Sequence, residues 1–219
     1  MALALYYHPL ASFCQKVLIA LYENDTPFTF KEIGPDHPDH IADWQRRWPI
    51  GKFPVLVDGD RTVAETSSII EYLQLHHAGP VRLIPGDPEA ALDVRFLDRF
   101  FDLHIMDAAQ HAVNGALTGD DTKRAEGMAT TIEKLNRAYP WIDAQLAGRS
   151  WAAGGDFTLA DCAAAPALFY ADWIYPIPAR FVTLRAYRAR LLARPSFARA
   201  VDDARYFRPY FPLGAPDRD

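Results

Sequence analysis

The sequence predicts a small α/β domain followed by an all-helical domain. Strand and helix signals alternate through roughly the first third of the chain, in the order β-α-β and then β-β-α. A proline-rich segment follows, and every periodic segment after it has helical spacing. A chain of 219 residues suits two domains of modest size. We therefore expect the first domain at 1–78, a linker at 79–88 and the helical domain at 89–219.

Short apolar or alternating runs indicate the strands of the first domain, and amphipathic runs indicate its helices. A loop rich in proline, histidine and aspartate separates its two halves and holds a short helix near 41–47. The predicted strands are "LALYYH" (3–8), "FTFKEI" (28–33), "FPVLV" (53–57) and "RTVA" (61–64). The predicted helices are "SFCQKVLIALYEN" (12–24) and "TSSIIEYLQLHHAG" (66–79).

The linker is predicted from "GPVRLIPGDPEA", which has three prolines in twelve residues and can continue neither a helix nor a central strand. Helical patterns fill the second domain up to a tail, "RPYFPLGAPDRD". The predicted helices cover residues 89–117, 121–147, 158–174, 179–192 and 196–207.

The composition disfavours several classes of function. The net charge of -5 and the lack of a long Lys/Arg cluster argue against a nucleic-acid partner. Apolar runs fall far short of the ~20 residues that span a membrane, and "MALALYYHP" has no signal-peptide features, so we expect a cytoplasmic protein. Two cysteines make no disulfide framework, and seven scattered histidines show no metal-ligand spacing, so we expect no metal.

Pro54 opens the predicted strand at 53–57, where it has no N–H to donate to a sheet. If the Phe53-Pro54 bond is cis, the backbone of Phe53 turns outward and can pair with an extended, peptide-like ligand. Only about 5% of X-Pro bonds are cis, so this proline alone favours an ordinary trans bond at an edge strand.

A possible site for an amino-acid zwitterion lies at the start of the helix predicted at 66–79. Thr66, or Ser67 beside it, suits the N-cap of this helix, and Glu65 precedes it. Helix N-terminal N–H groups suit a carboxylate, and Glu65 suits an ammonium group. The competing interpretation is a helix cap and nothing more.

The stretch "GGDFTLADCAAAP" predicts a capping box, with Thr158 at the N-cap and Asp161 at N3. A cap of this kind contributes about 1 kcal/mol to folding, so we interpret Asp161 as structural. Cys162 follows as a small buried apolar residue.

Together these segments resemble the cytosolic glutathione transferase family over nearly the whole chain. The similar segments are "LYYHPLASFCQKVLIAL", "IGKFPVLVDGD", "VAETSSIIEYL", "AGGDFTLADCAAAP" and "LLARPSFARAV". The resemblance implies a thioredoxin-like first domain, a helical bundle as second domain, a homodimer and a cis Pro54. It also implies glutathione as co-substrate and a role in detoxification.

The resemblance implies a set of glutathione-binding residues. Phe53, before Pro54, matches the position whose backbone pairs with the cysteinyl part of glutathione. Glu65 and Thr66 match the pair that holds its γ-glutamyl amino and carboxylate groups. Lys52 matches a position that several classes place near the tripeptide.

The catalytic position departs from the family pattern. The hydroxyl of the serine-type classes falls on Ala11 in "ASFCQKV", so we predict that Ser12, one residue later, serves the glutathione thiol. Cys14 matches only the second cysteine of a C-x-x-C pair. A tyrosine of the first strand, Tyr6 or Tyr7, is a further candidate.

The leading hypothesis is a glutathione transferase that attacks a small apolar electrophile between the domains. A non-catalytic binding protein, suggested by Ala11, is an alternative, and a thiol oxidoreductase acting through Cys14 is another. The candidate electrophile-site residues, several of which equally suit the core, are Leu10, Phe13, Phe100, His104, Met106, Tyr170 and Trp173.

Overall fold

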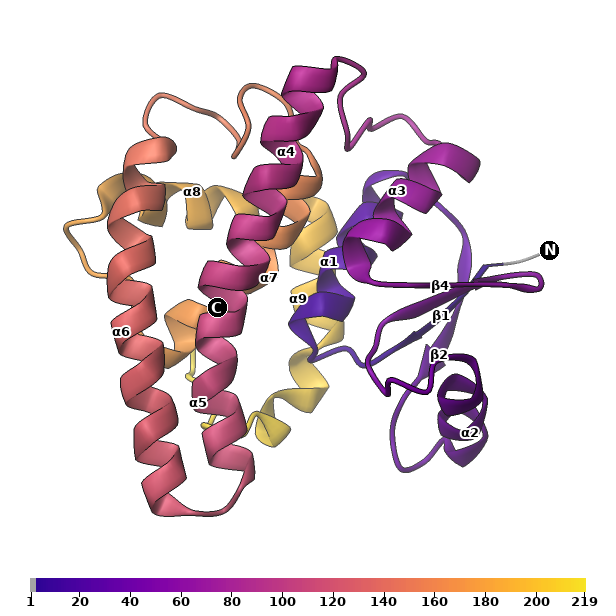
Figure 1. Cartoon of the computed structure of the whole chain (residues 1–219), viewed down its shortest axis with the longest axis horizontal. Helices are drawn as coiled ribbons and strands as arrows, with labels where there is room; N and C mark the ends of the chain where they lie inside the picture. The colour runs from indigo at the N-terminus through magenta and orange to yellow at the C-terminus, as the bar shows by residue number, and fades with distance from the viewer. Residues whose placement is uncertain (1–2) are drawn as a thin grey trace.

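A computed structural model describes residues 3–219 and has a mixed four-stranded sheet at one end and a helical array at the other (Figure 1). The first two residues of the predicted first domain lie outside the described part. The strands are β1 Leu3–Tyr7, β2 Phe28–Glu32, β3 Val55–Asp58 and β4 Arg61–Ala64. The helices beside them are α1 Ser12–Glu23, α2 Pro38–Arg47 and α3 Thr66–His76.

The sheet has the order β2-β1-β3-β4, with β1 parallel to β2 and antiparallel to β3. Alternate residues of a strand face opposite sides of a sheet. Leu3 and Leu5 accordingly belong to the main core, whereas Tyr6 packs with Trp44 of α2 on the other side. The sheet therefore lies between α2 on one face and α1 with α3 on the other.

Irregular backbone at 77–87 connects α3 to the helical array, and the proposed linker at 79–88 overlaps it. In Figure 1, α6 runs beside the continuous rod formed by α4 and α5. The α-helices of this part are α4 Pro88–Phe100, α5 Asp107–Leu117, α6 Asp121–Gln145, α7 Leu159–Ile174, α8 Val182–Leu192 and α9 Pro195–Asp203.

Two predicted helices differ from the observed ones in internal geometry. The helix expected at 89–117 contains a π-helical segment, η1 Phe101–Met106, between α4 and α5. The helix expected at 196–207 stops at Asp203, and a 3-10 segment, η2 Arg205–Tyr210, follows it. Side-chain periodicity does not distinguish these hydrogen-bonding patterns, because each continues a helical path.

The centre of the molecule is α7, in which every residue from Leu159 to Trp173 is buried. Its alanine-rich sequence lets α1 and α4 pack closely against it. The predicted capping box at its start is confirmed, because the Asp161 carboxylate accepts from the Thr158 N–H at 2.9 Å. Cys162 is buried as expected. The predicted fold class, α/β followed by all-α, is also confirmed.

Candidate functional site

The register of the sheet brings three predicted site segments to one end of it. Val55 of β3 pairs with Tyr6 of β1 on one side and with Ala64 of β4 on the other. Pro54 precedes this row and Glu65 follows it, so both lie at the same sheet end. The loop after β1, which leads to α1, leaves the sheet there too.

The tryptophan of α2 holds the segment that precedes β3. The Phe53-Pro54 peptide bond is cis, as the family resemblance implies. Trp44 donates from Nε1 to the carbonyl of Lys52 at 3.0 Å, and the rings of Trp44 and Phe53 lie 5.6 Å apart. Phe53 lies outside the sheet ladder because β3 begins at Val55. Its backbone is therefore at the position where an added extended segment can pair.

Glu65 has a backbone conformation that the sequence did not predict. The expectation that Thr66 or Ser67 is the N-cap of α3 is wrong, because Glu65 is the N-cap and Thr66 the first helical residue. Glu65 has a φ of 67°, which costs a non-glycine residue about 1 kcal/mol or more and is enriched at functional sites. Within residues 3–219 its exposed side chain makes no capping bond. Glu65 and the first N–H groups of α3 therefore belong to the same turn, and no capping bond joins the carboxylate to them.

A buried ionic network lies directly behind this turn. The Ser67 hydroxyl donates to Asp98 Oδ2 at 2.6 Å and accepts from Lys16 Nζ at 3.1 Å. Lys16, only 1% exposed, also contacts Asp98 Oδ1 at 2.6 Å and Asp102 Oδ2 at 2.7 Å. The network joins α1 and α3 to α4 and η1, so it fixes the turn against the helical part. Sequence reasoning missed it, although one lysine within the apolar run "CQKVLIAL" was a signal.

Ser12 is the first residue of α1 and is 8% exposed. The N-cap is Ala11, whose methyl side chain cannot accept a hydrogen bond, so the first N–H groups of α1 keep their anion-binding capacity. Gln15 Nε2 donates to the carbonyl of Pro9 and to the hydroxyl of Tyr170, at 3.0 Å each. This bond pair ties the loop before Ser12 to α7.

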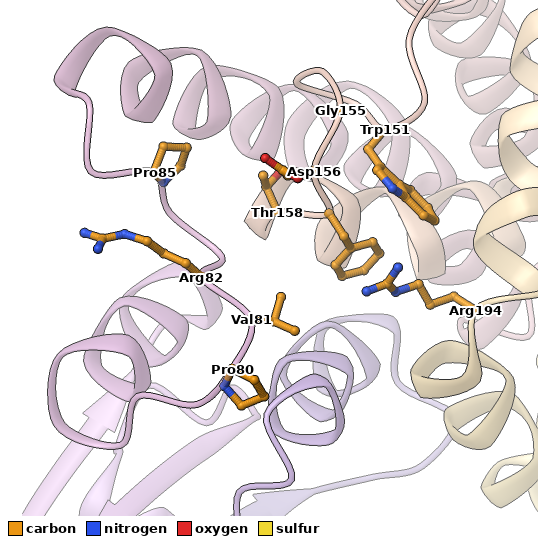
Figure 2. A pocket seen from close by; sticks show the side chains of 10 residues that line it. Pro80, Val81, Arg82, Pro85, Trp151, Gly155, Asp156, Thr158 and Arg194 are labelled. Carbon is orange, nitrogen blue, oxygen red and sulfur yellow. The ribbon is translucent and has the colours of Figure 1, made fainter.

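Two surface cavities lie elsewhere. The larger, about 430 Å³, lies between the linker and the α6–α7 connection (Figure 2). The smaller, about 400 Å³, lies beside α8. Neither is lined by a predicted glutathione-binding residue. Residues 3–219 contain no cluster of three metal-ligating side chains, and no helix among them is long and apolar enough to cross a membrane.

Comparison with known proteins assigns the family. The models described as "Glutathione S-transferase, N-terminal domain" and "Glutathione S-transferase, C-terminal domain" match residues 5–81 and 103–190. A solved glutathione S-transferase from Methylobacterium radiotolerans, in complex with glutathione sulfonate, is 31% identical, with a TM-score of 0.77 over 92% of this chain and 95% of that chain. The chain belongs to the glutathione S-transferase family. This confirms the family expected from the sequence and supports a glutathione-related function.

Other relatives in this family have different described roles. A "Probable maleylacetoacetate isomerase" of Vibrio cholerae is 29% identical, over 93% of this chain and 97% of that protein. "FtsZ-localized protein A" of Caulobacter vibrioides is 27% identical, over 91% of this chain and 90% of that protein. Membership in the glutathione S-transferase family therefore does not specify the reaction, which has to be argued from the residues of the site.

The alternative reactive groups lie in unfavourable surroundings. Cys14 is buried, accepts from the His8 N–H at 3.4 Å, and has its pKa raised by burial to about 12. The Tyr6 hydroxyl donates to Asp43 of α2, on the sheet face away from α1. Burial, followed by the charge of Glu32, raises the pKa of Tyr7. These positions disfavour a thiolate at Cys14 and a phenolate at either tyrosine.

The candidate electrophile-site residues fall into separate aromatic groups. The Phe100 ring packs at a tilt against the rings of Trp141 of α6 and of His104, with ring centroids 4.4 Å and 5.3 Å apart. Tyr170 and Trp173 of α7 are buried and pack against Phe211 of the tail. Met106 is buried in η1, whereas Leu10 and Phe13 are partly buried beside α1. Phe13 belongs to α1 itself and Leu10 to the loop before it, so these two candidates are the nearest in the chain to Ser12.

Proposed function

We propose that the protein is a glutathione transferase. Lys52, Phe53, Pro54, Glu65 and Thr66 hold glutathione, and Ser12 serves its thiol. The strand register carries this proposal, because it joins the cis-proline segment and the Glu65 turn at one sheet end. Three features of this sheet end match the groups of a γ-glutamyl tripeptide. The Phe53 backbone can pair with the peptide, the Glu65 carboxylate suits its amino group, and the N-terminus of α3 suits its carboxylate.

The proposed reaction is attack of the glutathione thiolate on a small apolar electrophile that binds between the domains. The thiolate is the reactive form of a thiol. The uncapped N-terminus of α1 supports stabilisation of that anion, with the Ser12 hydroxyl as an additional donor. Ala11 supplies no hydroxyl, so the N–H groups of the first turn and Ser12 share this role.

Calorimetric titration of glutathione tests the binding site. Glu65→Gln and Thr66→Ala are each expected to weaken binding by about tenfold or more, because each removes a partner of a charged ligand group. Ser68, two residues after Thr66 in α3, is exposed, so Ser68→Ala is the matched control and should bind glutathione like the wild type. Wild-type affinity in both site variants would contradict the proposed site.

A non-catalytic glutathione-binding protein is the second candidate. Ala11 favours it, as does the similarity to a relative described only by its localisation with FtsZ. Aryl halides and a maleyl-type isomerisation substrate, offered with glutathione, separate the candidates. Turnover above the buffer rate that decreases in Ser12→Ala supports the enzyme, whereas glutathione binding without any turnover supports the second candidate.

We also propose a homodimer. Leu92, Phe96 and Leu103 follow one another along α4 and η1 at helical spacing and are 60%, 54% and 47% exposed. An exposed apolar stripe of this kind is typical of an interface. Sedimentation should give a dimer mass for the wild type and a monomer mass for Phe96→Glu. A monomeric wild type would refute this proposal.

A further inference from the structure

The cavity of about 400 Å³ lies at the C-terminal end of α7, and none of its lining residues belongs to the proposed glutathione site. Its walls come from the end of α7, the turn after it, α8 and the tail. Pro176, Ile177 and Ala189 make the apolar part of the lining. The polar part consists of three arginines, Arg185, Arg188 and Arg218, and one acid, Asp172.

The carboxylate of Asp172 is already engaged on both oxygens. Oδ1 accepts from the Ile177 N–H at 2.8 Å, which holds the turn after α7. Oδ2 accepts from Arg218 Nη1 at 2.5 Å, and Arg218 Nη2 donates to the Asp172 carbonyl at 2.8 Å. Arg218 is therefore the arginine that Asp172 neutralises most directly.

Arg188 is left with an incomplete set of partners. Its side chain is 13% exposed, and its Nη2 lies 3.3 Å from Asp172 Oδ2, the oxygen that Arg218 already occupies. Its Nε and Nη2 are buried and have no hydrogen-bond acceptor in the described chain. Burial lowers the pKa of Arg188, and the charge of Arg218 adds to this. Donors buried without an acceptor cost free energy, and the ion pair with Asp172 offsets this cost only in part because Arg218 shares the same oxygen.

The charges of the lining do not balance. Arg185, Arg188 and Arg218 face one carboxylate, which leaves two positive charges in excess. A second acid whose charge acts on Arg188 is Asp219, but its carboxylate binds Arg205 and Arg208. A dianion would neutralise this excess, and guanidinium groups match the oxygens of a phosphate in geometry as well as in charge.

We propose that this cavity binds the phosphate group of a small organic phosphate. The arginines surround the phosphate, and the apolar wall of Pro176, Ile177 and Ala189 contacts the organic part. The cavity volume is within the range of small-molecule sites. The site is separate from the glutathione site and does not depend on the reaction proposed there.

Calorimetric titration with inorganic phosphate and with phenyl phosphate tests the site in the full chain. We expect one equivalent of each to bind, with phenyl phosphate tighter because it also contacts the apolar wall. Arg188→Gln should weaken both by about tenfold or more, and Arg185→Gln should weaken both to a smaller extent. Arg180→Gln, an exposed arginine outside the cavity, removes the same charge nearby and should bind like the wild type.

Circular dichroism shows whether Arg188→Gln folds. If Arg188→Gln does not fold, Arg185→Gln decides the result, because it changes an exposed residue. Equal weakening in Arg185→Gln and Arg180→Gln would overturn the proposal, because it would show only general charge attraction. Absence of a one-equivalent binding event would overturn it too. Phosphate binding that is lost in Thr66→Ala would place the anion in the glutathione site and refute a separate one.

Discussion

Among single residues, Ser12 is the one that we propose to assist ionisation of the glutathione thiol. A thiol with a pKa of ~8.5 is about 3% ionised at neutral pH, and lowering the pKa to ~7 raises this to about half. Because nucleophilicity falls as the pKa falls, the net gain in rate is only roughly threefold. If Ser12 acts as proposed, a larger effect on the rate would have to come from positioning, through the loop that Gln15 and Tyr170 hold.

We predict that Ser12→Ala keeps glutathione binding but raises the pKa of the bound thiol. The conjugation rate near neutral pH should fall by at least about threefold, the part that depends on ionisation. Thiolate absorbance across pH, measured with glutathione bound, checks this directly. An unchanged pKa would mean that the N–H groups of α1 act without the hydroxyl.

Cys14 is predicted to resist alkylation in the folded protein. Burial raises the pKa of its thiol from 9.0 to about 12, so the thiol stays protonated at pH values where a free cysteine ionises. For the same reason its contribution to stability is present below about pH 9 and is lost as the pH rises toward about 12. Iodoacetamide labelling before and after unfolding in urea is the measurement. Rapid native labelling of Cys14 would restore the thiol oxidoreductase hypothesis.

At the scale of elements, the N-terminus of α7 depends on one buried carboxylate. Asp161 accepts from the Ala152 N–H at 2.8 Å and from the Tyr187 hydroxyl at 2.6 Å, besides its bond to Thr158. Burial raises the pKa of Asp161, and these hydrogen bonds lower it in turn. The carboxylate thus joins α7 to α8 and to the connection before α7.

We predict that Asp161→Ala lowers the free energy of unfolding by about 3 kcal/mol or more, because it leaves several buried donors without an acceptor. Asp156→Ala, an exposed aspartate in the same connection, should change it by less than about 0.5 kcal/mol. Urea unfolding of both variants gives the comparison. Equal effects would show that the three hydrogen bonds contribute little.

For the molecule as a whole, Lys16 is a buried cation that joins the first domain to the helical domain. It lies on α1, while Asp98 and Asp102 lie on α4 and η1 across the domain boundary. Burial raises the pKa of Asp102, and Lys16 opposes this shift. Removing the lysine would leave two buried carboxylates without their main partner.

We predict that Lys16→Met destabilises the protein by about 3–5 kcal/mol near neutral pH. Part of this loss should return as the pH falls toward ~5, because a carboxyl with a raised pKa binds protons more tightly in the folded state. Unfolding measured at both pH values tests this. Lys134→Met breaks an exposed pair with Asp107 and should lower the free energy of unfolding by less than about 1 kcal/mol. A loss that small in Lys16→Met would contradict the prediction.

Local sequence patterns were enough to predict the order of strands and helices, the capping box at Thr158 and the family, because each depends on residues close together in the chain. They also indicated the Phe53–Pro54 and Glu65–Thr66 segments, since their motifs are local. Three features could be found only in the folded structure: the positive φ of Glu65, the Lys16 network and the arginine cavity. In the network and the cavity, the paired groups are far apart in sequence, as Lys16 is from Asp98 and Asp172 is from Arg218. Only packing brings such groups together and sets how completely their charges are compensated.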